Sequence, residues 1–122
     1  MASLAGMLQA GGHKVTGSDQ NVYPPMSTQL EELGIEIMKG YKPENLDVGA
    51  DRIIVGNTIS RGNPELEELL NRKLPYYSQA ETVKREFIRG RHSLTIAGTH
   101  GKTTTTSIAT WVMECGGLNP SF

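Results

Sequence analysis

One short run constrains this chain more than any other feature, and from Gly98 to Thr104 it reads Gly-Thr-His-Gly-Lys-Thr-Thr. It follows the apolar stretch 94–97, which predicts a short buried strand leading into a glycine-bracketed turn. A helix is expected to begin near Lys102, directly after the turn. A strand, a glycine turn and a helix that opens with Lys-Thr are typical of a nucleotide phosphate-binding loop, so the chain is predicted to handle phosphate.

Each part of this loop has a physical reason to hold polyphosphate. Gly98 and Gly101 allow the backbone to turn tightly, so that successive N–H groups can point inward. The N-terminus of the following helix adds a partial positive charge. Lys102 would neutralise the β- and γ-phosphates and the Thr103 hydroxyl would ligate Mg²⁺, so these two are the predicted catalytic residues. The predicted nucleotide-binding set is Gly98, Thr99, His100, Gly101, Lys102, Thr103 and Thr104.

The loop departs from the usual pattern G-x-x-x-x-G-K-[ST], because the first glycine of that pattern would fall on Ile96. It is therefore shorter, G-x-x-G-K-T-T. Within it, His100 either contacts phosphate or substrate or only shapes the turn. The alternative interpretation of the whole run is a strand, turn and helix with an ordinary N-cap. The agreement of strand, loop and helix favours the phosphate-binding loop.

Composition narrows the class of protein. The chain has 122 residues, enough for one domain, with 12 basic and 13 acidic side chains. No basic patch or basic helix face is evident, which argues against a nucleic-acid partner. No apolar stretch is long enough to span a bilayer, so no membrane association is expected. The lone cysteine, Cys115, rules out an internal disulfide and fits the reducing cytoplasm, and we expect it to be a small buried hydrophobe.

Strands and helices alternate along the chain. The predicted strands are 13–17, 35–38, 52–56, 75–77 and 93–97, and the predicted helices are 1–10, 24–33, 63–71 and 80–89. This alternation predicts an α/β fold with a Rossmann-like, doubly wound parallel sheet. The boundary is expected at Gly90-Arg91, which divides the chain into a domain 1–91 and the opening strand, phosphate loop and helix of a second α/β domain at 92–122.

Two helix starts carry recognisable signals. Ser27 or Thr28 is expected near the N-cap of the second helix, because hydroxyl side chains accept hydrogen bonds from free backbone amides there. Asn63-Pro64 is expected to start the third, because proline suits the first helical turn.

Polar side chains stand at the predicted strand ends, where doubly wound sheets bind their ligands. Ser18 and Asp19 follow one strand, and Asn57 and Thr58 follow another, so these four are the candidate substrate-binding residues. Asp19 stands where a nucleotide-binding fold places an acid that contacts ribose, or it caps a helix or turn. Asn57 and Thr58 either line the ligand cleft or belong to a turn before Gly62.

The start of the chain differs from the usual order. A doubly wound domain normally opens with a strand and a glycine turn, whereas this sequence opens inside a predicted helix. We therefore expect a first strand and its loop to belong before residue 1, and the rest of the second domain to belong after Phe122.

Taken together, the motifs resemble the Mur ligase family, the ATP-dependent amide ligases of bacterial cell-wall synthesis. The resemblance covers essentially the whole chain and rests on Gly17-Ser18-Asp19, Gly56-Asn57, Asn63-Pro64-Glu65 and the run 97–105. Within the family, the segments 21–28 (Asn-Val-Tyr-Pro-Pro-Met-Ser-Thr) and 61–64 (Arg-Gly-Asn-Pro), with Thr110-Trp111, are most similar to the branch that recycles murein peptides.

The resemblance implies a longer, cytoplasmic bacterial enzyme with a UDP-sugar domain, an ATPase domain and a third domain that helps to bind the amine. It implies ATP and Mg²⁺, and a reaction in which the lactyl carboxylate of UDP-N-acetylmuramate attacks the γ-phosphate of ATP. The amine of the tripeptide L-Ala-γ-D-Glu-meso-diaminopimelate then attacks the acyl phosphate. The alternative within the family is the ligase that adds L-alanine. The resemblance places Asn57 and Thr58 at a strand end that should line the UDP cleft, with the turn before Gly62 as the alternative.

Two other interpretations of the sequence do not require a ligase. A small kinase or GTPase would also carry a phosphate loop, although such proteins usually place it near the start of the chain, and here it follows a complete α/β unit. A binding module that retains only nucleotide-sugar affinity is the other. An open reading frame that continues for several hundred codons would favour the ligase.

Overall fold

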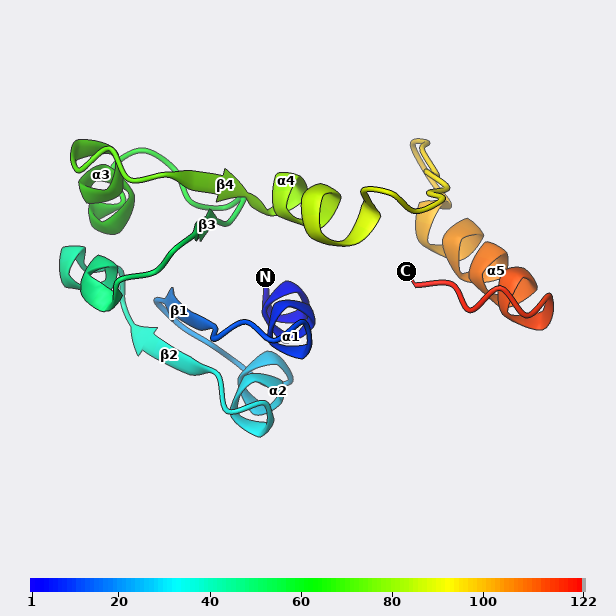
Figure 1. The fold of residues 1–122 in the computed structure, drawn as a ribbon, viewed down its shortest axis with the longest axis horizontal. Coiled ribbons are helices and arrows are strands. Elements are labelled where there is room, and N and C mark those ends of the chain that lie inside the picture. The colour runs from blue at the N-terminus through cyan, green and yellow to red at the C-terminus, as the bar shows by residue number, and fades with distance from the viewer. Residues whose placement is uncertain (122) are drawn as a thin grey trace. The chain divides into compact units, whose positions relative to one another are not determined.

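The computed structural model describes residues 1–121, which form two compact units that divide between Arg89 and Gly90 (Figure 1). The division lies beside the glycine and arginine at which the sequence predicts a boundary. No helix in the described range is both long and apolar enough to cross a membrane.

The first unit alternates strands and helices, as the sequence predicts. Its elements are α1 (Ala2–Ala10), β1 (Thr16–Asp19), α2 (Met26–Glu32), β2 (Glu36–Lys39), the 3₁₀ helix η1 (Pro43–Val48), β3 (Ile53–Val55), α3 (Pro64–Asn71), β4 (Tyr76–Ser78), α4 (Gln79–Val83) and the π-helix η2 (Lys84–Ile88). The α/β class is therefore confirmed.

The strands pair in parallel, but in two sheets rather than one. In the first sheet β1 pairs with β2, with Thr16 opposite Glu36, and in the second β3 pairs with β4, with Ile53 opposite Tyr76. Parallel pairing confirms the predicted crossovers. The expected single doubly wound sheet is not formed by residues 1–121, because the usual strand order places another strand between those that correspond to β1 and β3.

The core of the first unit lies where α1 and α2 meet the first sheet. Ala2, Leu30 and Ile35 form a buried cluster, against which Ala5, Val15, Val22 and Ile37 pack. The two helices approach closely at Gly6, where an added Cβ would lie 3.1 Å from Leu33 Cδ1. A hydrogen bond of 2.7 Å from Gln9 Nε2 to the Leu33 carbonyl closes the same contact.

The two helix starts differ in how they are capped. Asn63 caps α3, because its Oδ1 accepts hydrogen bonds from the backbone amides of Glu65 (3.0 Å) and Leu66 (3.1 Å), which confirms the predicted start. The predicted cap of α2 is wrong: Pro25 is its N-cap, without a side-chain cap bond. Ser27 and Thr28 lie in the first turn of the helix, and the Ser27 amide donates to the Tyr23 carbonyl at 3.2 Å.

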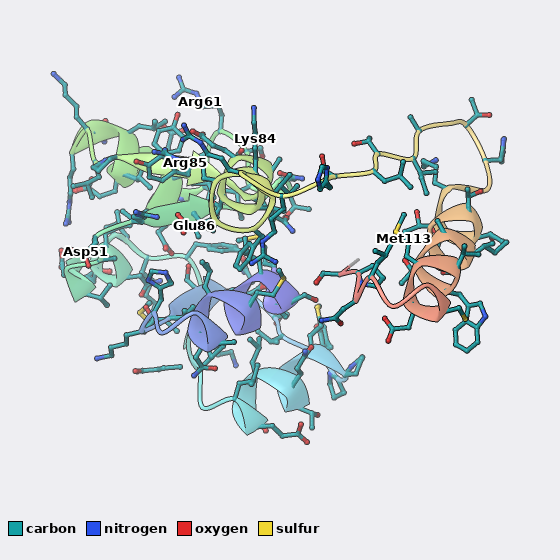
Figure 2. The ribbon with its side chains drawn as sticks, turned by 45° about the vertical axis from the view of Figure 1, so that its right-hand side comes forward. Asp51, Arg61, Lys84, Arg85, Glu86 and Met113 are labelled. Carbon is teal, nitrogen blue, oxygen red and sulfur yellow. The ribbon has the colours of Figure 1, made fainter. Side chains whose placement is uncertain are left out.

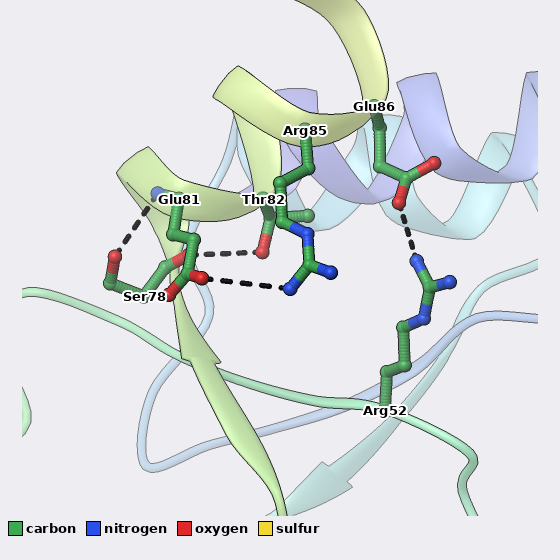
Figure 3. A network of polar contacts seen from close by, with 6 residues as sticks. All are labelled: Arg52, Ser78, Glu81, Thr82, Arg85 and Glu86. Atoms are coloured by element: carbon green, nitrogen blue, oxygen red, sulfur yellow. Dashed lines mark hydrogen bonds and ion pairs between the residues drawn. The ribbon is translucent and has the colours of Figure 1, made fainter. Parts of the chain in front are cut away.

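Polar contacts hold the end of β4 and the helices that follow it (Figure 3). The Ser78 hydroxyl accepts from the Glu81 amide at 3.1 Å, and the buried Thr82 hydroxyl donates to the Ser78 carbonyl at 2.9 Å. Arg52, just before β3, pairs with Glu86 on η2. The single predicted helix 80–89 is thus replaced by α4, which continues into a π-helical turn.

The second unit contains α5 (Lys102–Cys115), which begins at the predicted residue. Figure 2 shows Met113 on this helix, and the side chains of Ile108, Trp111 and Val112 are exposed. Cys115 is also exposed, so its predicted burial is wrong for the described chain. Among the described residues, none of α5 is buried, so these apolar side chains stay uncovered within this unit.

The predicted strand at 93–97 does not form. Residues 92–98 have no regular secondary structure, because a strand is defined by hydrogen bonds to a neighbour, and no other described segment pairs with this one. The predicted strand at 13–17 is displaced along the chain, and β1 therefore includes Ser18 and Asp19 rather than ending before them.

Replacement of Leu69 should test the packing of α3. Leu69 is only 2% exposed, and Leu69→Ala should lower the free energy of unfolding by about 2–5 kcal/mol, because the lost apolar burial leaves a cavity. Leu118→Ala is the matched control, since Leu118 is 71% exposed, and it should change stability by less than about 0.5 kcal/mol. Urea unfolding followed by circular dichroism measures both, and equal losses would contradict the assigned core.

Candidate functional site

The first candidate site lies at the carboxyl ends of β1 and β2, where α3 begins. The Ser18 hydroxyl donates to Glu65 Oε1 at 2.7 Å, and Asn45 Nδ2 donates to Glu65 Oε2 at 2.9 Å. Asn45 Nδ2 also donates to the Gly40 carbonyl at 2.9 Å. One carboxylate on α3 therefore joins β1 to the segment that follows β2. Sequence reasoning did not give Glu65 a role, although Asn63-Pro64-Glu65 was among the motifs.

Asp19 takes part in a second set of contacts at the same edge. Its Oδ1 accepts from the Asn21 amide at 3.2 Å and from the Tyr41 hydroxyl at 3.4 Å. The first contact stabilises the turn after β1, as the cap interpretation of Asp19 requires. The side chain nevertheless remains exposed, so it can also meet a ligand. Tyr41 was not predicted, because nothing in its local sequence marks it.

The environment of Tyr41 disfavours its ionised form. Burial raises the pKa of Tyr41 above its ordinary value of 10.0, the negative charge of Asp19 raises it further, and the hydrogen bond to Asp19 and the charge of Glu65 act in the same direction. A neutral phenol that donates to a carboxylate is therefore the stable form at this edge.

The predicted substrate residues border one cavity within the first unit. A space of about 1100 Å³ is lined by residues from all four strands and includes Ser18, Asp19, Asn57 and Thr58. Beside it, a more open hollow of about 400 Å³ is lined by Gln20, Tyr41 and the loop from Thr58 to Pro64. Asn57 and Thr58 are exposed in the turn that follows β3. The structure thus places the four residues at the edge of one space between the two sheets, which is also where the usual strand order places a further strand.

The end of β1 and the neighbouring hollow carry side chains of opposite charge. Asp19 and Glu65 place carboxylates at the end of β1, whereas Arg61 is the cationic side chain that lines the hollow. Arg61, labelled in Figure 2, lies 3.5 Å from Glu67 Oε2 through its Nη1. The Gly62 amide donates to the other oxygen of Glu67 at 2.9 Å, which steadies the loop that carries Arg61.

The second candidate site is the loop before α5. Gly101 adopts the left-handed conformation, with φ of 76°, at the N-cap of this helix. Lys102 Nζ donates to the carbonyls of Gly98 (2.9 Å) and Thr99 (3.3 Å), so the ammonium group folds back over the loop. All residues from Thr99 to Thr104 are exposed. The predicted loop residues are therefore adjacent and accessible to a ligand.

The hydroxyl side chains that follow Lys102 divide into two groups. The Thr106 hydroxyl donates to the Lys102 carbonyl at 2.9 Å, and the Ser107 hydroxyl donates to the Thr103 carbonyl at 3.0 Å. These side chains bond to their own helix. Thr103 and Thr104 lie on the exposed first turn, where backbone amides of a helix are free of intrahelical partners. This geometry fits a phosphate and a Mg²⁺ ion: the amides and Lys102 supply positive groups, and Thr103 supplies a hydroxyl.

The fold and the first site define the class. Parallel strands joined by helical crossovers, with polar side chains around a cavity at the strand ends, characterise α/β proteins of the doubly wound kind. The Mur ligase family, catalytic domain, matches residues 1–89, which are the whole first unit. The chain belongs to the Mur ligase family.

Two curated relatives are similar over the full chain. The UDP-N-acetylmuramate–L-alanyl-γ-D-glutamyl-meso-2,6-diaminoheptandioate ligases of Escherichia coli (strain K12) and Haemophilus influenzae are each 48% identical over 122 residues. The chain spans 27% of the length of each, so it corresponds to a part of these proteins.

Two solved structures share the fold. The crystal structure of UDP-N-acetylmuramate:L-alanyl-γ-D-glutamyl-meso-diaminopimelate ligase from Neisseria meningitides matches 100% of this chain and 38% of its own, with a TM-score of 0.94 and 43% identity. A murein peptide ligase from Psychrobacter arcticus matches 96% of this chain and 24% of its own, with a TM-score of 0.89 and 44% identity.

The Tyr41–Asp19 contact can be tested by titration. Because the pKa of Tyr41 is raised on folding, stability from its neutral form should be complete below pH 10.0 and disappear as the pH rises through the folded pKa. Asp19→Asn should lower the pKa of Tyr41 towards 10.0, but not fully, because burial remains. Tyrosinate absorbance measures this ionisation, with Tyr41→Phe identifying the signal and Asp51→Asn as the control. A titration unchanged by Asp19→Asn would contradict the contact.

Proposed function

We propose that this chain is part of an ATP-dependent ligase that joins the lactyl carboxylate of UDP-N-acetylmuramate to the amine of L-Ala-γ-D-Glu-meso-diaminopimelate. The observation that carries the proposal is the 48% identity, over 100% of the chain, to a ligase named for that reaction. The structural match to ligases of the same name supports it.

We assign the two halves of the chain different ligands. The segment 1–91 would hold the UDP-sugar, in support of which Ser18, Asp19, Asn57 and Thr58 stand at the carboxyl ends of its parallel strands. The segment 92–122 would open the ATP-binding domain, in support of which its loop combines a left-handed glycine, a lysine and a helix N-terminus. The rest of the ligase chain would supply the remaining ATP contacts and the amine site.

In this proposal the phosphate loop acts by placing charge rather than by covalent chemistry. Backbone amides from Gly98 to Thr104 would surround the phosphates of ATP. Lys102 Nζ would exchange its bonds to the Gly98 and Thr99 carbonyls for the β- and γ-phosphate oxygens. Thr103 would ligate Mg²⁺, which screens the phosphate charge when it is bound. The carboxylate of the sugar could then approach the γ-phosphate against less repulsion.

In the first half, the side chains around the cavity would bind and orient the UDP-sugar. Asp19 stands beside the exposed end of β1, where a carboxylate can accept from a ribose hydroxyl. Asn57 and Thr58 lie exposed at the end of β3, where amide and hydroxyl groups can bind the remaining polar atoms of the nucleotide. Holding the sugar in one orientation would bring its carboxylate to the γ-phosphate.

Competition between amines tests the reaction. The full-length ligase, supplied with ATP, Mg²⁺ and UDP-N-acetylmuramate, should form an amide with L-Ala-γ-D-Glu-meso-diaminopimelate in preference to L-alanine. Mass spectrometry distinguishes the two products. Preference for L-alanine would assign the chain to the other branch of the family, and absence of reaction with both amines would overturn the proposed ligase.

Replacement of Lys102 tests the phosphate loop. Lys102→Ala in the full-length ligase should lower turnover by about a hundredfold or more, because one positive contact to the reacting phosphates is lost. Lys102 is exposed, so the fold should be retained. Lys84→Ala, a matched change at an exposed lysine on η2, should leave turnover near that of the wild type. Phosphate release measures both, and similar rates for the two variants would refute the role of Lys102.

A further inference from the structure

Glu65 is a polar group at the first site to which the proposed reaction gives no task. Both of its carboxylate oxygens are engaged, Oε1 by the Ser18 hydroxyl at 2.7 Å and Oε2 by Asn45 Nδ2 at 2.9 Å. Its backbone is also held, because the Glu65 amide donates to Asn63 Oδ1 at 3.0 Å. The carboxylate is therefore fixed in position by the start of α3 and by two partners from other elements.

The contact with Glu65 determines what Ser18 can do. A serine hydroxyl has one proton to donate and two lone pairs that accept. A carboxylate only accepts, so the Ser18 proton is directed at Glu65 Oε1. The remaining lone pairs of Ser18 can then only accept a hydrogen bond from a ligand.

Asn45 makes this arrangement difficult to reverse. Its amide nitrogen donates to both Glu65 Oε2 and the Gly40 carbonyl, each at 2.9 Å. Turning the amide over would place its oxygen against two acceptors, so the orientation is set by both bonds. Glu65 Oε2 is thus occupied, and Oε1 remains directed at Ser18.

The charges around Ser18 select the group that it can meet. Glu65 contacts Ser18 directly, and Asp19, the next residue of β1, lies opposite Lys39 of β2, so Glu65 is the charged group in contact with Ser18. A ligand hydroxyl group can donate to the Ser18 oxygen, whereas an ionised phosphate oxygen only accepts and cannot bond to it. The cationic side chain that lines the neighbouring hollow is Arg61, on the loop after β3, and it is the better neighbour for a diphosphate.

We propose that Glu65 is a positioning residue that holds Ser18 as an acceptor for a ribose hydroxyl of the bound nucleotide. The inference rests on the proposed function, since it takes the ligand to be a UDP-sugar. Ser18 then recognises a ribose hydroxyl, and Glu65 acts through Ser18 without touching the ligand.

Discrimination against deoxyribose tests this proposal in the full-length ligase. The ligands are UDP-N-acetylmuramate and its 2′-deoxyribose and 3′-deoxyribose counterparts, and calorimetry gives the dissociation constants. The wild type should bind the parent compound about tenfold more tightly than one of the deoxy compounds, the usual effect of one hydrogen bond. Glu65→Ala should reduce this ratio to about twofold or less, because no partner then holds the Ser18 hydroxyl in one orientation towards the ligand.

Two further variants distinguish positioning from simple destabilisation. Ser18→Ala removes the acceptor without touching α3, and it should abolish the same discrimination. Glu68→Ala is the matched control on α3, since Glu68 pairs with Arg72 at 2.7 Å and not with Ser18, and it should retain the wild-type ratio.

The outcomes separate the inference from the proposed function. A Glu65→Ala or Ser18→Ala variant that binds all three ligands more weakly by the same factor would overturn the positioning role and leave the UDP-sugar site intact. A wild type that binds UDP-N-acetylmuramate but accepts both deoxy compounds equally well would also overturn it. A wild type without affinity for UDP-N-acetylmuramate would overturn the proposed function and this inference together.

Discussion

The arrangement of the first site depends on the carboxylate of Glu65. Each sheet has only two strands, so backbone pairing alone does not hold the ends of β1 and β3 at one place. Glu65, which begins α3 after β3, bonds to Ser18 on β1 and to Asn45 on η1, and thereby joins the carboxyl ends of the two sheets through side chains. Such a network is sensitive to the loss of any member, because each partly buried polar group then lacks its partner.

The two units present opposite chemistry to a nucleotide. The strand ends of the first unit carry carboxylate, hydroxyl and amide groups, which suit the hydroxyls of a sugar. The loop of the second unit carries a lysine and free amides at the start of α5, which suit phosphate. Our proposal of a UDP-sugar for one unit and ATP for the other rests on this difference in charge, and the names of the relatives include UDP-N-acetylmuramate.

Local signals predicted several features correctly. Asn63-Pro64 marked the start of α3, and Lys102 marked the start of α5, because capping and the glycine turn depend on a few adjacent residues. Features that depend on distant partners were predicted less well. The segment 93–97 is apolar enough for a strand, but it has no pairing partner among residues 1–121, and β1 extends through Asp19 because Lys39 on β2 lies opposite.

The sequence by itself determined the α/β class, the parallel pairing and the family, because periodicity, turn residues and motifs are local properties, whereas the four candidate residues at the strand ends stay a prediction. Tertiary structure decided how those residues are used. The bond from Ser18 to Glu65 spans 47 positions in the chain, and that from Tyr41 to Asp19 spans 22, so no local pattern reveals either. Only the folded chain brings these groups within hydrogen-bonding distance, and that proximity sets the direction of each bond and the charge around the cavity.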